Sequence, residues 1–325
     1  MDNQSASASN NHLPYHNTQY LAGLLVGIMA VSTASIFIRF AQVEIPSLVI
    51  AAGRLTLATL VIAPFAVKRW VKDRVVLDRK TWGLLTVAGL FLGLHFVTWI
   101  TSLEYTSIAS SVVLVTTAPL WVAFLSPIFL KEKISQWVLI GLVIALSGAV
   151  IVGVGSSCMF SGGKLVCQGM EEWWSGRNFV GNILALMGAI LSGAYLMVGR
   201  SVRNRLSLPI YTAIVYGIAS IVLIILVILT GTPVGGYSSA SYLWVAALAL
   251  VPQVIGHTAF NWALKYLSAT YVSIALLGEP IGTVILAALF LREMPAILEI
   301  LGGVLILSGI ILATRKSMSK ANPPV

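Results

Sequence analysis

The residues with the greatest capacity for chemistry are the few ionisable side chains that interrupt long apolar segments. Glu279 lies near the middle of one such segment, Arg54 lies about eight residues into another, and Glu299 lies about one turn into a third. A carboxylate at Glu279 could bind a substrate ammonium group or exchange a proton. The alternative is a neutral or arginine-paired carboxyl that only braces helices. Glu299 can extend to nearby water, so we interpret it as structural.

Arg54 is the single basic residue at comparable depth in the apolar segments. Its planar guanidinium could bind a carboxylate or phosphate of a substrate. It could equally pair with Glu279 or hydrogen-bond to free backbone carbonyls, and we favour this structural role.

Two prolines interrupt apolar segments at corresponding places. Pro280 directly follows Glu279, and Pro119 lies in an earlier segment. A proline inside a helix removes one backbone hydrogen bond and crowds the carbonyl four residues before it. The carbonyls of Leu276 and Val115 are therefore expected to be free. Paired helix interruptions are a pointer to a binding site in transport proteins.

Two further segments carry polar side chains at helical spacing. Gln253, His257 and Asn261 are spaced four residues apart, and His95 and Trp99 show the same spacing. This spacing places each set on one helical face. We expect these faces to line a common cavity; the alternative is interhelical hydrogen bonding in a packed core. Because histidine titrates near neutral pH, His95 and His257 are also candidates for proton coupling.

The elements that position these residues follow from the composition. The 325 residues are 58% hydrophobic and only 10% charged, and the mean hydropathy is +0.93. So few charges cannot cover a soluble surface, which excludes a soluble enzyme, a disordered chain and a disulfide scaffold. A membrane-spanning helix needs about 20 mostly apolar residues. Ten such segments are predicted, at 21–39, 46–67, 81–101, 107–130, 136–155, 179–199, 209–230, 241–264, 270–291 and 296–314.

The distribution of basic residues predicts the orientation. With a cytoplasmic N-terminus, 15 of the 20 Lys and Arg residues fall on the cytoplasmic side and four on the outer side, with Arg54 inside a span. This bias matches the positive-inside rule. The net charge of +9 is therefore interpreted as an orientation signal and not as a nucleic-acid footprint. Residues 1–20 and 315–325 are expected to be cytoplasmic tails, the first of them disordered.

The longest connection, 156–178, is predicted to lie on the outer side and contains both cysteines, Cys158 and Cys167. If that side is oxidising, a disulfide between them is expected. Two free thiols are the alternative.

An internal repeat divides the chain into 21–155 and 179–314. A shift of 161 residues places Pro119 on Pro280 and Gly141 on Gly302, and Ser32 aligns approximately with Ser192. Each copy holds five predicted spans, and because five is odd the second copy must enter the membrane from the opposite side. Inverted repeats of this kind build transporters that expose a central site alternately to each side. The predicted fold is thus an all-α membrane protein of ten helices.

The sequence resembles the EamA-like family of the drug/metabolite transporter superfamily over about residues 20–314. The likeness is carried by an ordered set of short motifs in both halves: Gly53-Arg54-Leu55 with Ala58, Ala109 to Pro119-Leu120, Pro280, Leu130-Lys131-Glu132, Leu291-Arg292-Glu293, Ser147-Gly148 and Ser308-Gly309. The family usually has glycine where Lys131 and Arg292 stand. The resemblance implies a ten-helix bundle with a central cavity that moves small metabolites.

The functional expectation is a secondary transporter in the cell membrane that exports amino acids or similar small polar metabolites, with protons as a candidate coupling ion. Efflux of lipophilic cations or drugs is the alternative, and an intramembrane lipid-modifying enzyme is a weaker one. No nucleophile elbow, Cys-x-x-Cys pair or phosphate-binding Gly-Lys loop is present in the sequence. We therefore expect no enzymatic activity, cofactor, metal site or nucleic-acid partner. The sequence leaves the oligomeric state open.

Overall fold

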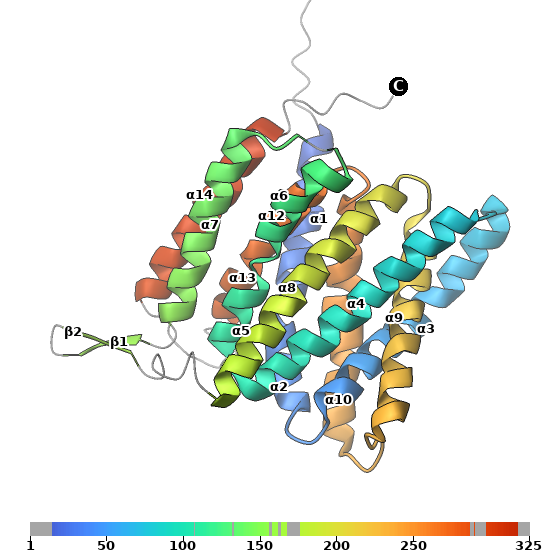
Figure 1. Cartoon of the computed structure of the whole chain (residues 1–325), viewed down its shortest axis with the longest axis horizontal. Coiled ribbons are helices and arrows are strands. Elements are labelled where there is room, and N and C mark those ends of the chain that lie inside the picture. Colours follow the sequence, from blue (N-terminus) through green and yellow to red (C-terminus); the bar gives the residue numbers. More distant parts are fainter. Residues whose placement is uncertain are drawn as a thin grey trace, which may run out of the picture.

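The structure is a computed structural model, and it describes residues 15–106, 108–131, 133–155, 158–161, 164–167, 176–286, 289 and 297–317. Long helices make up nearly all of this part of the chain (Figure 1). Helices are expected because an apolar segment in lipid must satisfy its backbone hydrogen bonds internally. The predicted tail residues 1–14 and 318–325 lie outside the described residues.

The first half of the chain contains seven helical segments. They are α1 (Tyr15–Val31), α2 (Ala34–Ala41), α3 (Ser47–Asp73), α4 (Arg79–Tyr105), α5 (Ile108–Val115), α6 (Ala118–Phe129) and α7 (Gln136–Gly155). Helix α1 begins six residues before the predicted start at residue 21, so the last part of the tail expected to be disordered is helical.

The second half repeats this order. It contains α8 (Gly176–Arg203), α9 (Leu208–Thr230), α10 (Ser239–Leu248), a π-helical segment (Ala249–His257), α11 (Thr258–Ala263), α12 (Ala269–Ala275), a 3-10 turn (Leu276–Gly278), α13 (Glu279–Leu286) and α14 (Ile297–Ser317).

Seven helices of the described chain are long and apolar enough to cross a membrane. They are Gln19–Ala41, Ser47–Asp73, Arg79–Tyr105, Ser111–Phe129, Gly176–Arg203, Leu208–Thr230 and Ser239–Ala263. Gln136–Ile151 and Ile300–Ala313 are shorter apolar helices. The ninth predicted span, 270–291, is the broken segment α12 to α13, and its last part lies largely outside the described residues. The chain is thus an integral membrane protein.

Both predicted proline interruptions coincide with helix breaks. Thr116 and Thr117 separate α5 from α6, so Pro119 stands in the first turn of α6. Pro280 likewise stands in the first turn of α13, directly after the 3-10 turn. The prediction that the Leu276 carbonyl is free was wrong, because this oxygen accepts the backbone N–H of Glu279. The tighter 3-10 pattern supplies the donor that proline lacks.

Helices related by the repeat pack against each other in pairs. Helix α7 lies beside α14, and α3 lies beside α9 (Figure 1). A Cβ atom on Gly148 would stand 2.6 Å from the carbonyl oxygen of Gly302, and one on Gly141 would stand 2.5 Å from that of Gly309. The 161-residue shift places Gly148 on Gly309 and Gly141 on Gly302, so each of these contacts is the repeat image of the other. Because the lower number on α7 meets the higher number on α14, these equivalent helices run antiparallel.

The pair α3 and α9 obeys the same exchange. The hydroxyls of Thr56 and Ser220 are 2.6 Å apart, and a Cβ on Gly217 would lie 3.5 Å from the methyl of Thr59. Adding 161 to 56 and 59 gives 217 and 220, so one contact is the image of the other. The two halves of the chain are therefore related by an approximate twofold operation.

The first helix of each half aligns one residue away from the sequence expectation. Ser32 contacts the carbonyl oxygen of Glu279, at 3.0 Å. In the other half, a Cβ on Gly193 would lie 3.4 Å from the carbonyl oxygen of Ala118. Since Ala118 and Glu279 are equivalent, Ser32 is equivalent to Gly193 and not to Ser192. The offset of 161 residues thus holds from the first helix of the repeat to the last.

The connection between the halves contains a β-hairpin that the sequence did not predict. Strand β1 (Cys158–Ser161) pairs antiparallel with β2 (Lys164–Cys167), and the register sets Cys158 opposite Cys167. The hairpin lies at the end of α7, at the opposite end of the molecule from the C-terminus (Figure 1).

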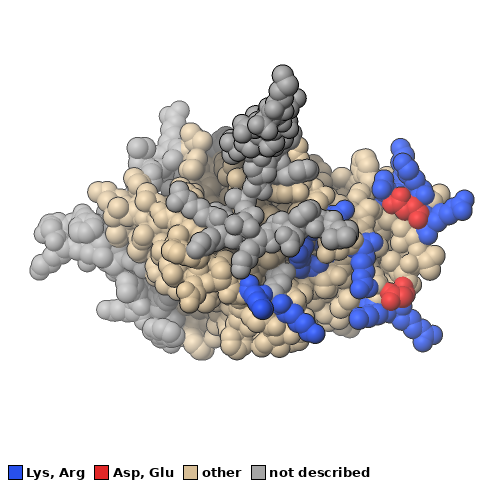
Figure 2. Space-filling view, turned by 90° about the horizontal axis from the view of Figure 1, so that it is seen from above, with Lys and Arg blue, Asp and Glu red and all other residues tan. Residues whose placement is uncertain are grey.

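Basic side chains gather at the end of the molecule where α14, the last described helix, ends. Seen from above, this face shows Lys and Arg in the centre and on the right of the view, with few acids among them (Figure 2). Lys68, Lys72 and Arg74 at the end of α3 are exposed there, as is Arg79 at the start of α4. Such a one-sided distribution is typical of the cytoplasmic face of a membrane protein.

Candidate functional site

A cavity lies where the interrupted helices meet. The cavity is narrow in this structure: its volume is about 50 Å³, which is well below the usual range for small-molecule sites. Its lining comes from six of the predicted spans and consists of Val31, Ala34, His95, Trp99, Val115, Thr116, Ala118, Pro119, Ser192, His257, Ser273, Leu276 and Glu279. The first, fourth, sixth and ninth spans thus join the third and eighth, whose polar faces were expected to line a common cavity.

The cavity lies on the approximate twofold axis. Three pairs of its lining residues are exchanged by the 161-residue shift: Val31 with Ser192, Val115 with Leu276, and Ala118 with Glu279. A residue and its image can both line one space only if that space lies near the axis. The last pair breaks the symmetry most, because it places a carboxyl on one wall and a methyl group on the other.

Glu279 is held by its backbone and leaves its carboxyl accessible. Its carbonyl oxygen accepts hydrogen bonds from Ser32 Oγ at 3.0 Å and Thr283 Oγ1 at 3.1 Å. The side chain is partly exposed, and no described residue hydrogen-bonds to its carboxyl or forms an ion pair with it. A carboxyl that faces a cavity without a partner is available to a ligand.

His95 and Trp99 form one wall of the cavity. Their rings stack with centroids 6.0 Å apart and an interplanar angle of 9°. His95 Nδ1 lies 2.9 Å from the carbonyl oxygen of Gly188. Because a carbonyl only accepts, Nδ1 carries the proton, and Nε2 of the neutral ring is an acceptor. Trp99 Nε1 is buried and has no hydrogen-bond partner among the residues that the structure describes.

His257 lines the cavity, whereas its two neighbours on the same predicted face do not. Its ring meets the ring of Phe96 edge-on, with centroids 5.1 Å apart. The π-helical segment that contains Gln253 and His257 widens the helical turn. Residues four apart in this segment therefore do not lie on one helical face, contrary to the expectation from the sequence.

Arg54 and Gln253 lie behind the cavity wall. Arg54 is fully buried, donates from Nε to Gln253 Oε1 at 2.8 Å, and packs its guanidinium 4.1 Å from the centre of the Phe96 ring. Its Nη1 and Nη2 atoms have no hydrogen-bond partner in the described part of the chain. The charge of Arg54 interacts with Glu279, but the two side chains do not form a direct ion pair. The structure therefore places this cation outside the cavity lining, against Phe96, whose ring in turn contacts the lining residue His257.

Asn261 belongs to a separate buried network. Its Oδ1 accepts from Tyr195 OH at 2.5 Å, and its Nδ2 donates to Tyr216 OH at 3.1 Å. Arg203 donates from Nε to the Asn261 carbonyl at 2.7 Å. With its amide oxygen and nitrogen already bonded, Asn261 ties α8, α9 and α11 together and does not line the cavity.

Sequence reasoning missed three hydroxyl groups of the cavity wall, those of Ser192, Thr116 and Ser273. Thr116 donates to the Val113 carbonyl at 2.9 Å, and Ser273 donates to the Thr270 carbonyl at 2.8 Å. Their oxygen lone pairs remain able to accept. For Thr116 and Ser273 the available signal was their position within two turns of Pro119 or Pro280, the residues that mark the breaks; Ser192 on α8 has no such signal.

The arrangement suits a small molecule with a positive group and hydrogen-bonding capacity. Among the lining residues, Glu279 carries the only carboxyl and no Lys or Arg is present. Two imidazoles, an indole N–H and three hydroxyls provide further donors and acceptors. The described residues contain no group of three or more side chains that could hold a metal ion.

Comparison with known proteins agrees with this architecture. A model of the EamA-like transporter family matches residues 18–154 and 179–315, two segments that are also 161 residues apart. A crystal structure of another protein has a TM-score of 0.75 at 15% identity and covers 94% of this chain and 99% of its own, which shows the common fold.

Three relatives have names that refer to transport. A transporter described as uncharacterized from Clostridium kluyveri is 24% identical over 82% of both chains. One from Archaeoglobus fulgidus, described in the same way, is 23% identical over 91% of this chain and 96% of its own. A probable terminal-alkyne amino-acid exporter from Streptantibioticus cattleyicolor is 25% identical over 64% of both chains.

Proposed function

Because the chain belongs to the EamA-like transporter family, we propose that it is a secondary active exporter of amino acids or similar small polar metabolites. The observation that carries this proposal is the cavity on the twofold axis with the unpaired carboxyl of Glu279 in its wall. The relative that is named an amino-acid exporter supports the same substrate class.

The proposed topology has ten transmembrane helices in two inverted five-helix repeats, with both termini in the cytoplasm. Equivalent helices run antiparallel where Gly148 approaches Gly302 and where Thr56 approaches Ser220. A twofold axis that relates antiparallel membrane helices lies in the membrane plane, as it does in inverted repeats. The gathering of Lys and Arg at the end of the molecule where α14 ends supports the cytoplasmic assignment (Figure 2).

In the proposed binding mode, Glu279 receives the substrate ammonium group. The substrate carboxylate accepts from the unpartnered indole N–H of Trp99, and the two imidazoles and the hydroxyls orient the remaining polar atoms. Arg54 contributes its positive field from behind Phe96 and does not touch the substrate. A direct contact between Arg54 and the substrate carboxylate is not part of this binding mode, because the buried guanidinium does not line the cavity.

Transport proceeds by alternating access in this proposal. Helices α6 and α12 pack together between the cavity and the basic end, where the hydroxyls of Thr270 and Ser126 are 3.5 Å apart. The repeat images of these segments are α13 and α5 on the other side of the cavity. When α13 and α5 adopt the packing that α6 and α12 have here, and α6 and α12 separate, the cavity closes on one side and opens on the other. Proton binding by Glu279 in exchange for the substrate ammonium would couple the cycle to a proton gradient.

Efflux of lipophilic cations is the second candidate. It is favoured by the apolar residues of the wall, such as Val31 and Leu276, and by the stacked rings of His95 and Trp99 beside one carboxyl. An aromatic wall can attract a cation without a second charged group.

The two substrate classes can be distinguished in proteoliposomes by counterflow of labelled amino acids. We expect saturable uptake that unlabelled amino acids inhibit and that a lipophilic cation such as tetraphenylphosphonium does not. Inhibition by the lipophilic cation alone would assign the second candidate. Turnover of lipid without solute movement would contradict both.

For the outer hairpin, we propose a disulfide between Cys158 and Cys167. Its support is the register, which sets the two residues directly opposite each other on adjacent strands. Maleimide labelling of protein prepared without reductant tests this bond: labelling only after reduction is expected, and equal labelling before reduction would contradict it.

A further inference from the structure

A second hollow in the molecule lies on the outside of the bundle, between α3 and α9. Its volume is about 320 Å³. One face of α3 from Thr59 to Val71 forms one wall, and Ile210, Ala213 and Ile214 form the other. The hydroxyl of Thr59 is directed to its own helix, where it donates to the Leu55 carbonyl at 2.7 Å. The surface of this groove is therefore almost entirely hydrocarbon.

The groove has the length of one lipid leaflet. At a rise of about 1.5 Å per residue, the eleven helical steps from Thr59 to Trp70 span roughly 16 Å. Half of a typical hydrocarbon core is about 15 Å. Trp70 stands at the end of the groove that meets the basic face, the depth at which tryptophan is enriched in membrane proteins.

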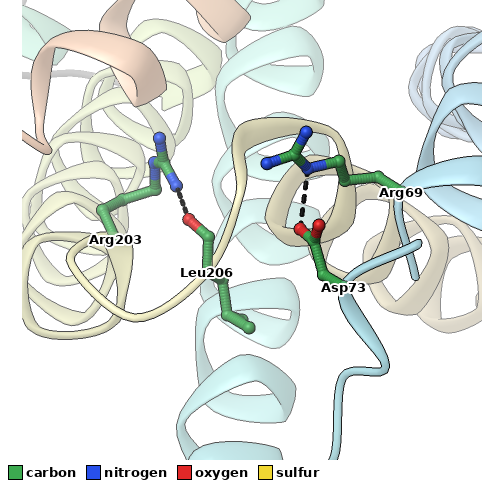
Figure 3. Close-up of polar contacts among 4 residues, drawn as sticks. All are labelled: Arg69, Asp73, Arg203 and Leu206. Carbon is green, nitrogen blue, oxygen red and sulfur yellow. Dashed lines mark hydrogen bonds and ion pairs between the residues drawn. The ribbon is translucent and has the colours of Figure 1, made fainter. Parts of the chain in front are cut away.

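Two free cations stand at this end of the groove. Arg74 caps α3 immediately after the lining residues, and its backbone N–H donates to the carbonyls of Trp70 and Val71. Arg205 lies in the connection before α9, five residues before Ile210. Both side chains are exposed. In the described chain, the acid Asp73 at this end forms an ion pair with Arg69 at 2.7 Å (Figure 3). Arg74 and Arg205 take no part in this ion pair.

The acids near these arginines form no ion pair with them in the described chain. Asp78 interacts electrostatically with Arg205, but its carboxylate already accepts the backbone N–H of Thr81 at 3.0 Å, at the start of α4. The connection that carries Leu206 lies beside the end of α3 (Figure 3). The two arginines thus border one mouth of the groove from two different elements.

The internal repeat provides a comparison within the molecule. The images of Ala63 and Ala66 in the second half are the larger residues Ile224 and Val227. The image of Arg74 is Gly235, and the image of Arg205 is Glu44. The repeat-related position on the opposite side of the membrane therefore has bulkier side chains where the groove has alanine, and an acid where the groove has a cation. Small side chains and free cations occur together on one side only.

From this combination we propose that the groove between α3 and α9 binds an anionic phospholipid of the leaflet next to the basic face. One acyl chain lies along the alanines of the groove, and the phosphate is held by Arg74 and Arg205. Anionic lipid is favoured over zwitterionic lipid because two unpaired arginines stand at headgroup depth. The site is separate from the central cavity, so its occupancy is independent of the transported substrate.

Native mass spectrometry of the purified full chain tests this site with phosphatidylglycerol and phosphatidylcholine of identical acyl chains. One molecule of phosphatidylglycerol should bind about tenfold to thirtyfold more tightly than phosphatidylcholine, at roughly fivefold for each arginine. Arg74→Gln with Arg205→Gln should abolish this preference. The matched control Lys68→Gln with Lys72→Gln removes the same charge from exposed positions outside the groove and should change the preference less than about twofold.

The acyl chain is tested separately by filling the groove. Ala63→Leu with Ala213→Leu should weaken the bound molecule of either lipid, whereas the control Leu60→Phe on the exposed lipid-facing surface should not. Equal losses in the arginine and lysine variants would overturn the proposal, as would unchanged binding in the filled groove. Displacement by inorganic phosphate would assign a free-anion site instead. A dimer that the filled variant loses would assign the groove to a second copy of the chain.

Discussion

Substitution of Gly148 with alanine should separate helices α7 and α14 and destabilise the protein. The new Cβ would stand 2.6 Å from the Gly302 carbonyl oxygen and 2.8 Å from the Ile306 nitrogen. Both are backbone atoms, so no side-chain rotation relieves the contact. The helices must move apart by about 0.8 Å to restore an ordinary contact of 3.4 Å. A gap of this size forfeits roughly a quarter to a half of the dispersion energy of the atoms that it separates.

The free-energy cost follows from these contacts. Overpacking of this kind costs about 1–3 kcal/mol, and the higher helix propensity of alanine offsets roughly 0.5–1 kcal/mol of it. We expect a net loss of about 1–2 kcal/mol, or a few degrees in Tm. Gly309 is the repeat image of Gly148, and its Cβ would stand 2.6 Å from the Ala145 nitrogen. Gly309→Ala should therefore cost the same within about 0.5 kcal/mol.

Thermal unfolding in detergent measures both variants beside Gly83→Ala, where a Cβ meets nothing within 4 Å. This control should be neutral or slightly stabilising. In the double variant Gly148→Ala with Gly309→Ala, the second substitution should cost less than the first, because the helices have already separated. A Gly148→Ala variant as stable as the control, or a large loss at only one of the two equivalent sites, would refute the twofold packing.

Three further predictions concern single contacts. Trp99→Phe keeps the ring but removes the unpartnered N–H, so KM for an amino acid should rise roughly tenfold or more with little change in Tm; an unchanged KM would remove Trp99 from the binding mode. Ser32→Ala loses the hydrogen bond to the Glu279 carbonyl and should cost about 1 kcal/mol in thermal unfolding, and a neutral result would show that this contact does not hold α13. Hydrogen bonds from the side chain and backbone of Thr81 lower the pKa of Asp78 from its ordinary value of 3.8. The stabilisation by the charged form is thus present above pH 3.8 and is lost as the pH falls through the lower folded pKa. Asp78→Asn should accordingly lower Tm at pH 7, with a difference that closes in strong acid, and a difference that persists there would contradict the role of the charge.

The overall architecture was predictable from the sequence because its signals are local and repeated. Apolar segments of about 20 residues define spans without knowledge of their partners. Pro119 and Pro280 marked the broken helices because proline acts on its own backbone. The predicted 161-residue offset agrees with the two segments that the family model matches.

The candidate site was only partly predictable because it depends on which helical faces meet. Glu279, His95, Trp99 and His257 line the cavity as expected, but Arg54 lies behind Phe96. Sequence spacing cannot show that an aromatic ring separates a charge from a cavity.

Two local departures from ideal helix geometry caused further differences. The π-helical turn over Ala249–His257 altered the face that carries Gln253. The 3-10 turn before Glu279 supplied a donor to the Leu276 carbonyl, which a regular helix with Pro280 would have left free. Both effects depend on backbone rearrangements that a fixed period of 3.6 residues does not contain.

The central claim is that amino acids cross the membrane through the cavity in contact with the carboxyl of Glu279. Its most direct test is counterflow of labelled amino acid in proteoliposomes that contain wild-type protein, Glu279→Gln or the control Glu44→Gln. Glu44 is an exposed acid whose carboxylate accepts the backbone N–H of Ser238 at 2.8 Å, outside the cavity. We predict saturable counterflow for the wild type and Glu44→Gln, and at least a tenfold loss for folded Glu279→Gln. Equal counterflow in all three proteins, or none in the folded wild type for any amino acid, would contradict the claim.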